Sequence, residues 1–176
     1  MVELRLVPLD EEHLDDVRAM LGDPDILHFT RIPEPTPDDF AERWIARYRN
    51  GREDGSCDGF AAVDGDGRFA GLALAVAIHR EDAEVELGYI VPPDARGRGV
   101  ATEMLRQLTQ WAFDEGMQRV VALISTDNPA SSRVAEKAGY TFEGVLRSMH
   151  HRGDLRENLE SWSILPGELP APRPPS

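Results

Sequence analysis

The feature that most constrains this chain is residues 87–102, where an apolar, strand-like run passes through a glycine-containing turn directly into a helix start. A helix N-terminus presents unpaired amides and a partial positive charge, and glycine lets the backbone approach an anion without a Cβ in the way. Arg96 and Arg98 add two cations to the same turn, and guanidinium groups fork well onto phosphate oxygens. The segment therefore predicts a phosphate cradle at the end of a β-strand. The alternative is a plain tight turn with solvated arginines.

Spacing separates the known kinds of phosphate loop. A Walker loop needs Gly-x4-Gly-Lys-Ser/Thr, and the sequence contains no such run. A dinucleotide fingerprint needs Gly-x-Gly-x-x-Gly/Ala; Gly97 and Gly99 fit, but the third position is Thr102. The next acidic strand end, Asp127, lies further along than the ~20 residues that this fingerprint expects. A nicotinamide site is therefore disfavoured.

Hydrophobic spacing predicts three consecutive strands before this turn, over residues 59–63, 68–78 and 84–91. Residues 64–67 read Asp-Gly-Asp-Gly, which is typical of a hairpin turn, so the strands form an antiparallel meander. The pattern after the turn predicts a helix over 100–112, a buried strand over 119–124, a helix over 129–138 that ends at Gly139, and a strand pair over 140–148 and 159–165.

The first third of the chain is predicted to be mostly helical. A short strand over residues 3–8 precedes a helix capped by Asp10, and a brief helix follows over residues 24–29. Thr36 as N-cap with Pro37 at the first helical position predicts another helix, which closes near Gly51. Five of the eleven residues from 166 to 176 are proline, so we expect a folded domain over 1–165 and a disordered tail over 166–176.

Composition limits the class of protein further. The 176 residues carry 19 Lys and Arg against 32 Asp and Glu, a net charge of −13, so we expect no general nucleic-acid binder. No apolar stretch approaches the roughly 20 residues that cross a bilayer, and the N-terminus is acidic, unlike a signal peptide. One cysteine, Cys57, cannot form an intrachain disulfide. We therefore expect a single soluble, cytoplasmic domain without a membrane partner.

Two motifs together resemble those of the GNAT N-acetyltransferase family. Arg96-x-x-Gly99-x-Ala101, after a strand and at a helix start, looks like the acetyl-CoA signature Gln/Arg-x-x-Gly-x-Gly/Ala. Residues 128–144 are similar to the second conserved block of the family. This block, with Asn128-x-x-Ser131 and the run Glu-Gly-Val-Leu-Arg at 143–147, most resembles the ribosomal-protein alanine acetyltransferase branch.

The resemblance implies an α/β (α+β) acyltransferase fold. Its central sheet is expected to be mixed and mostly antiparallel, flanked by helices, and splayed between the fourth strand (84–91) and the fifth (119–124). The implied reaction is direct attack of a primary amine on acetyl-CoA, with no metal. A homodimer is compatible with it, since dimers are common among similar proteins.

The resemblance also assigns residues to acetyl-CoA. Tyr89, Ile90 and Val91 would pair with the pantetheine arm as an added strand would. Asn128 would bond the pantetheine through its amide, and Ser131 would stand near the sulfur. The pyrophosphate would lie on the turn and helix start formed by Arg96, Gly97, Arg98, Gly99, Val100, Ala101 and Thr102.

Acyl transfer to an amine needs a group that removes the amine proton and a donor that polarises the thioester carbonyl. Ser131 is the expected donor to the departing thiolate, because Ala135 stands where many relatives carry a tyrosine acid. The backbone amide of Val91 is the expected carbonyl donor. Glu84 and Glu86 share one face of the fourth strand, which leads to the expected slot between this strand and the fifth. Glu86 is the nearer of the two to this slot and is the candidate base. The alternative is that both are solvated carboxylates.

The acceptor side is the part that sequence determines least. Trp44, Tyr48 and Glu84 are the candidate substrate-binding residues. The acidic balance suggests a cationic acceptor, either a protein N-terminus in a basic context, a polyamine or an aminoglycoside-like amine. A non-catalytic CoA-binding protein is the remaining alternative. His150 and His151 are adjacent in a predicted strand and point to opposite faces, so they form a poor metal chelate.

Overall fold

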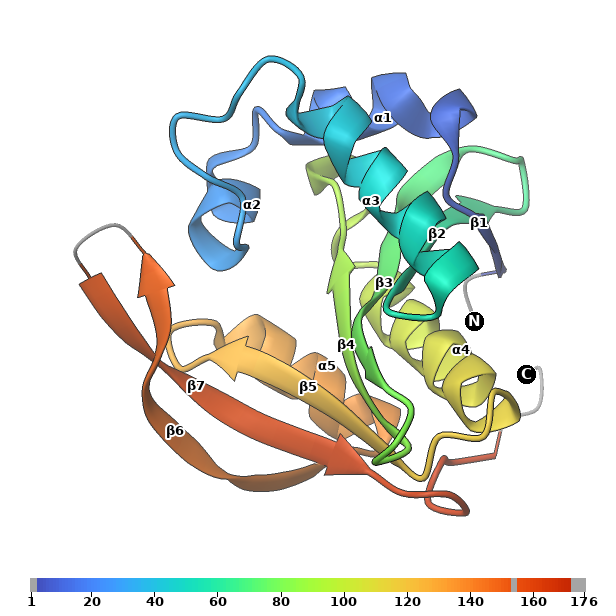
Figure 1. Cartoon of the computed structure of the whole chain (residues 1–176), viewed down its shortest axis with the longest axis vertical. Helices are drawn as coiled ribbons and strands as arrows, with labels where there is room; N and C mark the ends of the chain where they lie inside the picture. The colour runs from blue at the N-terminus through green and yellow to red at the C-terminus, as the bar shows by residue number, and fades with distance from the viewer. Residues whose placement is uncertain (1–2, 153–154, 172–176) are drawn as a thin grey trace.

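The computed structural model describes residues 3–152 and 155–171. It contains seven strands, five α-helices and two short 3-10 turns within these ranges (Figure 1). In chain order they are β1 (Leu4–Pro8), η1 (Glu11–His13), α1 (Leu14–Met20), α2 (Pro24–Phe29), α3 (Phe40–Asp54), β2 (Asp58–Asp64), β3 (Phe69–His79), β4 (Glu84–Ile90), η2 (Pro93–Ala95), α4 (Val100–Asp114), β5 (Arg119–Ser125), α5 (Pro129–Ala138), β6 (Thr141–Arg152) and β7 (Leu155–Ile164).

The strands form one sheet in the order β1-β2-β3-β4-β5-β7-β6. Every neighbouring pair is antiparallel except β4 and β5, which run parallel. The connection between those two strands is α4, as a parallel pair requires a crossover. The predicted mixed, mostly antiparallel sheet flanked by helices is confirmed.

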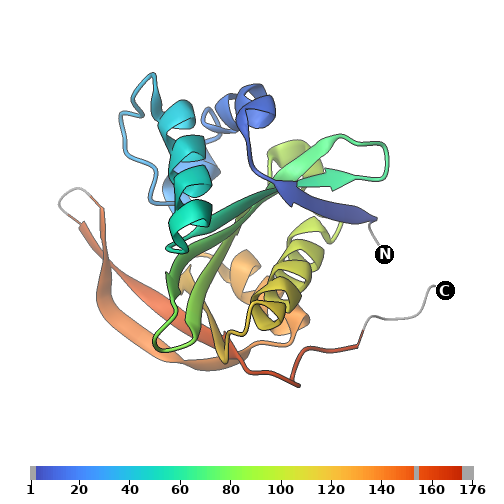
Figure 2. The same cartoon turned by 45° about the vertical axis from the view of Figure 1, so that its right-hand side comes forward.

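Two hydrophobic cores lie on opposite faces of the sheet, and Figure 2 shows the helices that cover each face. On one face, α4 buries Met104, Leu105 and Leu108 completely against the strands, as its helical spacing of apolar residues predicts. On the other face, the N-terminal helices bury Ile45 and Tyr48 of α3. The sheet is therefore the middle layer of three.

The start of α3 differs from the sequence prediction. The helix begins at Phe40 after the N-cap Asp39, three residues beyond Pro37. The Thr36 hydroxyl donates to the Pro33 carbonyl at 3.0 Å and so stays within the proline-rich loop, where it caps no helix. The prediction of Thr36 as N-cap was therefore wrong. At its other end, the helix continues past Gly51 to Asp54 and closes at Gly55.

The last strand pair is longer than hydrophobic spacing predicts. β6 and β7 form a hairpin in which His150 opposes Glu157 and Leu146 opposes Leu159. Register shifts interrupt β6 twice, and these irregularities break the alternation of apolar residues from which strand length is read. Within this hairpin, β7 pairs with β5 from Val120 to Ser125, and β6 lies on the far side of β7 (Figure 1).

The segment after β7 folds back in a short turn. The Leu165 amide donates to the Glu168 carboxylate at 2.9 Å, and the Glu168 amide donates to the Leu165 carbonyl at 3.1 Å. Leu169 then packs against the core on the α4 face. Residues 172–176 of the predicted tail lie outside the described residues.

Candidate functional site

The parallel strands β4 and β5 separate soon after they begin. Their pairing covers only Glu84 to Glu86 on β4 and Arg119 to Val121 on β5. From Leu87 to Ile90, β4 continues to pair with β3 on its other side, so its edge toward β5 has no strand partner. A cavity of about 1070 Å³ opens there, lined by residues of both strands. Unpaired strand edges bind extended chains through their backbone groups, so this edge suits an elongated ligand.

The turn before α4 borders the same cavity. Gly97 and Gly99 have φ angles of 76° and 83°, which side-chain-bearing residues rarely adopt, and no other atom lies within 4 Å of where a Cβ would stand. No side chain caps α4, and the amides of Val100, Ala101 and Thr102 in its first turn have no intrahelical partner. This open, amide-lined turn has the shape and the charge that a pyrophosphate requires.

The two arginines of the turn have protein partners. Arg96 lies 2.6 Å from a carboxylate oxygen of Asp23 and 3.2 Å from one of Asp25, and its Nε donates to the Val91 carbonyl. Burial raises the pKa of Asp23, but the hydrogen bond and the charge of Arg96, together with hydrogen bonds from backbone amides, outweigh it and leave that pKa below its ordinary value. Arg98 donates to the Asp94 carbonyl at 2.7 Å and does not line the cavity. The expected fork onto phosphate thus differs from the structure, in which Arg96 holds the start of α2 at the loop.

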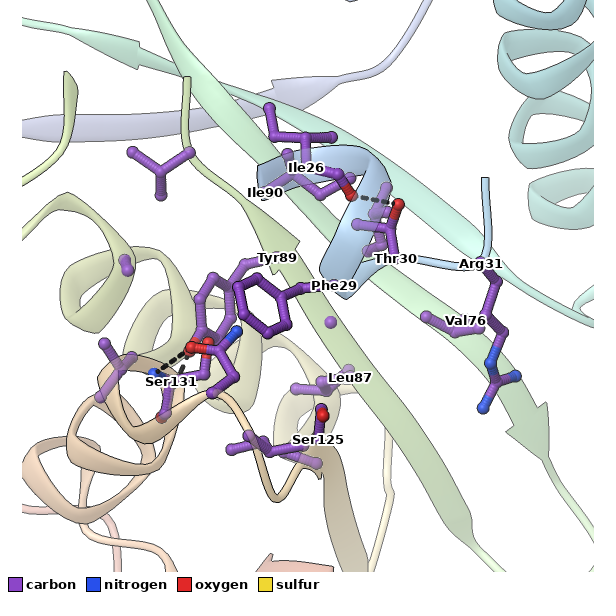
Figure 3. Close-up of a pocket in the computed structure, with 18 of the residues that line it drawn as sticks. Ile26, Phe29, Thr30, Arg31, Val76, Leu87, Tyr89, Ile90, Ser125 and Ser131 are labelled. Carbon is purple, nitrogen blue, oxygen red and sulfur yellow. Dashed lines mark hydrogen bonds between the residues drawn. The ribbon is translucent and has the colours of Figure 1, made fainter. Parts of the chain in front are cut away.

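The start of α5 forms the opposite wall of the cavity. The side-chain oxygen of Asn128 caps the helix by accepting from the Ser131 amide at 3.1 Å, which leaves its amide nitrogen for a ligand. Figure 3 shows Tyr89 reaching from β4 to Ser131, where its hydroxyl donates to the Ser131 carbonyl at 3.4 Å. Burial raises the pKa of Tyr89 to about 12, so this hydroxyl stays protonated at neutral pH. Within the described residues, the Ser131 hydroxyl has no hydrogen-bond partner and is free to donate.

Two of the predicted substrate-binding residues meet the predicted base at the other end of the cavity, which we call the acceptor end. Trp44 and Tyr48 of α3 line it together with Glu86 of β4. Glu86 is 24% exposed, and one of its oxygens lies 3.5 Å from Arg31 Nη2. Burial raises the pKa of Tyr48 to about 12, so it is a neutral wall residue rather than a base.

Glu84 lies away from this group, although it shares a strand face with Glu86. Its carboxylate accepts from Arg119 Nε at 2.8 Å, and Arg119 also pairs with Glu143 at 2.6 Å. Hydrogen bonds from Arg119 hold the pKa of Glu143 at about 2. Glu84 does not line the cavity, which differs from its prediction as a substrate-binding residue, because this ion network holds it where β4 and β5 still pair.

Several residues that line the cavity were not predicted from the sequence. Arg133 and Lys137 lie one turn apart on α5, and this spacing on one helix face is the signal that could have identified them. His150 Nδ1 lies 3.3 Å from Glu157 across the β6–β7 hairpin, and both line the cavity, whereas His151 does not. Three further arginines, on α3 and after α2, come to the cavity only through the fold.

Two kinds of feature are absent from the part of the chain that the structure describes. No group of three or more His, Cys, Asp or Glu side chains there could hold a metal ion. Over the same residues, no helix is both long and apolar enough to cross a membrane.

Comparison with known proteins identifies related chains. The sequence matches the acetyltransferase (GNAT) domain family over residues 3–141. The uncharacterized N-acetyltransferase YoaA of Bacillus subtilis is 30% identical over 90 residues, which cover 51% of each protein. The chain spans about half the length of the curated relatives it matches.

Two solved structures share the fold over nearly the whole chain. The ribosomal L7/L12 alpha-N-protein acetyltransferase RimL, solved with coenzyme A, superposes with a TM-score of 0.84 at 18% identity and covers 94% of this chain and 95% of that one. The spermidine N-acetyltransferase of Vibrio cholerae, solved with CoA and spermine, superposes with a TM-score of 0.82 at 18% identity, covering 94% and 97%.

Proposed function

Because the chain belongs to the GNAT acetyltransferase family, we propose that it moves an acetyl group from acetyl-CoA to a primary amine. One observation carries the proposal. The unpaired edge of β4 and the amide-lined turn that opens α4 border the same cavity, so a single elongated ligand can bond both. Acetyl-CoA has this form, with an extended pantetheine arm that ends in a pyrophosphate.

The binding roles follow from the two walls. The backbone of Tyr89, Ile90 and Val91 would accept the pantetheine arm along the open edge, and the free amide nitrogen of Asn128 would bond it from α5. The first turn of α4 would hold the pyrophosphate, where the helix dipole favours negative charge. Arg133 and Lys137 would add positive charge on the α5 side.

Acetyl-CoA supplies an activated thioester, so the chain needs no covalent nucleophile. Glu86, which lies toward the acceptor end of β4, would take the proton from the attacking amine through a chain of water molecules as the carbon–nitrogen bond forms. The amide of Val91, which directly follows β4, would donate to the carbonyl oxygen as negative charge develops on it. The free Ser131 hydroxyl would donate to the thiolate as the carbon–sulfur bond breaks.

The acceptor that we propose is the N-terminal amine of a protein. The similarity of residues 128–147 to the ribosomal-protein alanine branch supports it, and so does the likeness in fold to RimL. A polyamine is the second candidate, since spermidine acetyltransferases share the fold equally well. Arg31, Arg43 and Arg47 line the acceptor end of the cavity, where they would repel a polycation. They therefore favour the protein N-terminus as the acceptor.

An acetyl-transfer assay separates the candidates. The protein would be incubated with acetyl-CoA and either peptides that begin with Ala or Ser, spermidine, or an aminoglycoside. Release of free CoA thiol gives the rate, and mass spectrometry locates the added acetyl group. We expect turnover on the peptides at their N-terminal nitrogen. Turnover on spermidine alone would replace the proposed acceptor by a polyamine, and no turnover on any amine would leave a CoA-binding protein.

A further inference from the structure

The cavity carries a charge opposite to that of the whole protein. Six Arg and Lys residues line it against three Asp and Glu residues, although the chain has a net charge of −13. Three of the cations lie toward α5 and the turn before α4: Arg133 and Lys137 would add positive charge near the proposed acetyl-CoA phosphates, and Arg96 pairs with Asp23 and Asp25. The other three, Arg31, Arg43 and Arg47, lie at the acceptor end, and acetyl-CoA binding does not account for them.

The acceptor-end arginines come from two segments. Arg43 and Arg47 lie one turn apart on α3, and Arg31 follows α2. Figure 3 places Arg31 beside the Val76 label, at the end of the pocket opposite to Ser131. The Val76 carbonyl accepts from Arg47 Nη2 at 3.2 Å, which brings Arg47 to the same end.

Arg47 is the least neutralised of the three. Its guanidinium donates to the Val76 carbonyl and lies 5.2 Å from the centre of the Tyr48 ring. No carboxylate of the described residues lies within ion-pair distance of it. Arg43 forms an ion pair at 2.9 Å with Asp39, which does not line the cavity. Arg31 forms an ion pair at 3.5 Å with Glu86. A guanidinium has five donors, so Arg47 retains several for a ligand.

We propose that Arg31, Arg43 and Arg47 bind a carboxylate of the acceptor, so that the preferred substrate is a protein N-terminus with an acidic residue close behind its amine. This inference rests on the proposed function and names the class of its substrate. The amine would lie at the thioester, between it and Glu86, and the chain behind the amine would pass the three arginines. Guanidinium groups recognise carboxylates through paired, charge-assisted hydrogen bonds.

The test compares matched acceptors. Peptides that begin Ala-Asp-Asp, Ala-Asn-Asn and Ala-Lys-Lys differ in charge at nearly constant length, and an amino acid such as aspartate tests a small carboxylate-bearing amine. We expect the Asp peptide to exceed the Asn peptide about 10- to 100-fold in kcat/KM, which is the range for hydrogen bonds to charged groups. The difference should lie in KM for the peptide. Aspartate as a better substrate than any peptide would identify a small-molecule source of the same chemistry and overturn the protein acceptor.

Variants assign the effect to the arginines. In Arg47→Gln, the preference for Asp over Asn should fall to about threefold or less, while the KM for acetyl-CoA stays unchanged. The matched control is Arg68→Gln, since Arg68 pairs with Asp66 on the hairpin turn, away from the cavity. Equal loss on the Asp, Asn and Lys peptides in Arg47→Gln, at unchanged Tm, would overturn the proposal. Preference of the wild-type protein for the Lys peptide would do the same.

A binding measurement separates this inference from the proposed function. Calorimetric titration of the CoA-loaded protein with the Asp and Asn peptides needs no turnover. Tighter binding of the Asp peptide, with no acetyl transfer to any amine, would keep the carboxylate site and remove the enzymatic role. Equal or absent binding of both peptides would reject the carboxylate site, whether or not the protein acetylates other amines.

Discussion

Substitution of Gly71 by alanine tests how the end of β4 is positioned. Gly71 lies on β3 with a φ of 150°, and a Cβ there would stand 2.4 Å from the Ile90 carbonyl oxygen and 3.1 Å from Met104 Cε. Ordinary contact begins near 3.4 Å, so the shortfall against a backbone atom is about 1 Å. Because Ile90 ends β4 and precedes the proposed carbonyl donor Val91, the added methyl should push this segment toward the cavity.

Two destabilising effects and one stabilising effect determine how much Gly71→Ala changes the free energy of unfolding. Holding alanine at this φ costs about 1–3 kcal/mol, and overpacking costs about 1–3 kcal/mol. The smaller backbone entropy of the unfolded alanine chain returns about 0.4–1 kcal/mol. We therefore expect Gly71→Ala to lower the free energy of unfolding by about 3 kcal/mol, within a range of about 1–6 kcal/mol, and the Tm by roughly 6–12 °C for a domain of this size.

Urea unfolding and a thermal scan measure the effect, and titration with acetyl-CoA should show weaker binding. Gly88→Ala is the matched control, because Gly88 lies on β4 with an ordinary φ and its nearest neighbour, Val76 Cγ2, is 3.4 Å from the added Cβ. The free energy of unfolding of Gly88→Ala should lie within about 1 kcal/mol of that of the wild type, or above it. Equal stability of Gly71→Ala and Gly88→Ala would show that the Ile90 carbonyl does not restrict the side chain at position 71.

Two further predictions concern catalysis and acid stability. Ser131→Ala should lower kcat by about 100-fold with acetyl-CoA binding intact. The matched control Ser132→Ala loses a 2.7 Å hydrogen bond to Glu160, so it should cost about 1 kcal/mol of stability and leave kcat unchanged. Steady-state kinetics and urea unfolding distinguish the two variants, and an equal loss of kcat in both would show that Ser131 is misplaced. The pKa of Glu143 is about 2 when folded, against an ordinary 4.5, so its ion pair with Arg119 stabilises the fold fully above pH 4.5 and progressively less as pH falls toward 2. The stability difference between wild type and Glu143→Gln should therefore shrink between pH 6 and pH 3, and a constant difference would contradict the assigned cause.

The order of the elements could be predicted because local patterns carry it. The meander, α4, β5 and α5 all lie near their predicted bounds, since each has clear apolar spacing and a glycine or proline near one end. The splay of the sheet came from the resemblance of two motifs, not from periodicity. The start of α3 was missed because a Thr-Pro pair resembles a cap, whereas the loop hydrogen bond of Thr36 competes with capping.

The site was less predictable because ion pairs join segments far apart in sequence. Arg96 and Asp23 are 73 residues apart, so no local pattern shows that this arginine holds α2. Glu84 and Glu86 share a strand face, yet Arg119 binds one and Arg31 the other. Apart from Arg98, the predicted turn and helix-start residues lie at the cavity because backbone conformation follows from local sequence, whereas side-chain charge pairing does not.

The central claim is that acetyl-CoA binds between β4 and β5 with its phosphates at the start of α4. Calorimetric titration of the folded protein with acetyl-CoA tests it most directly, with NADH as the control ligand and Gly99→Glu as the control variant. Gly99 has a φ of 83° and no atom near its absent Cβ, so glutamate there places a carboxylate in the cradle. We expect micromolar binding of acetyl-CoA, no binding of NADH, and loss of acetyl-CoA binding in Gly99→Glu while the variant stays folded. Absence of acetyl-CoA binding to the folded wild-type protein would contradict it.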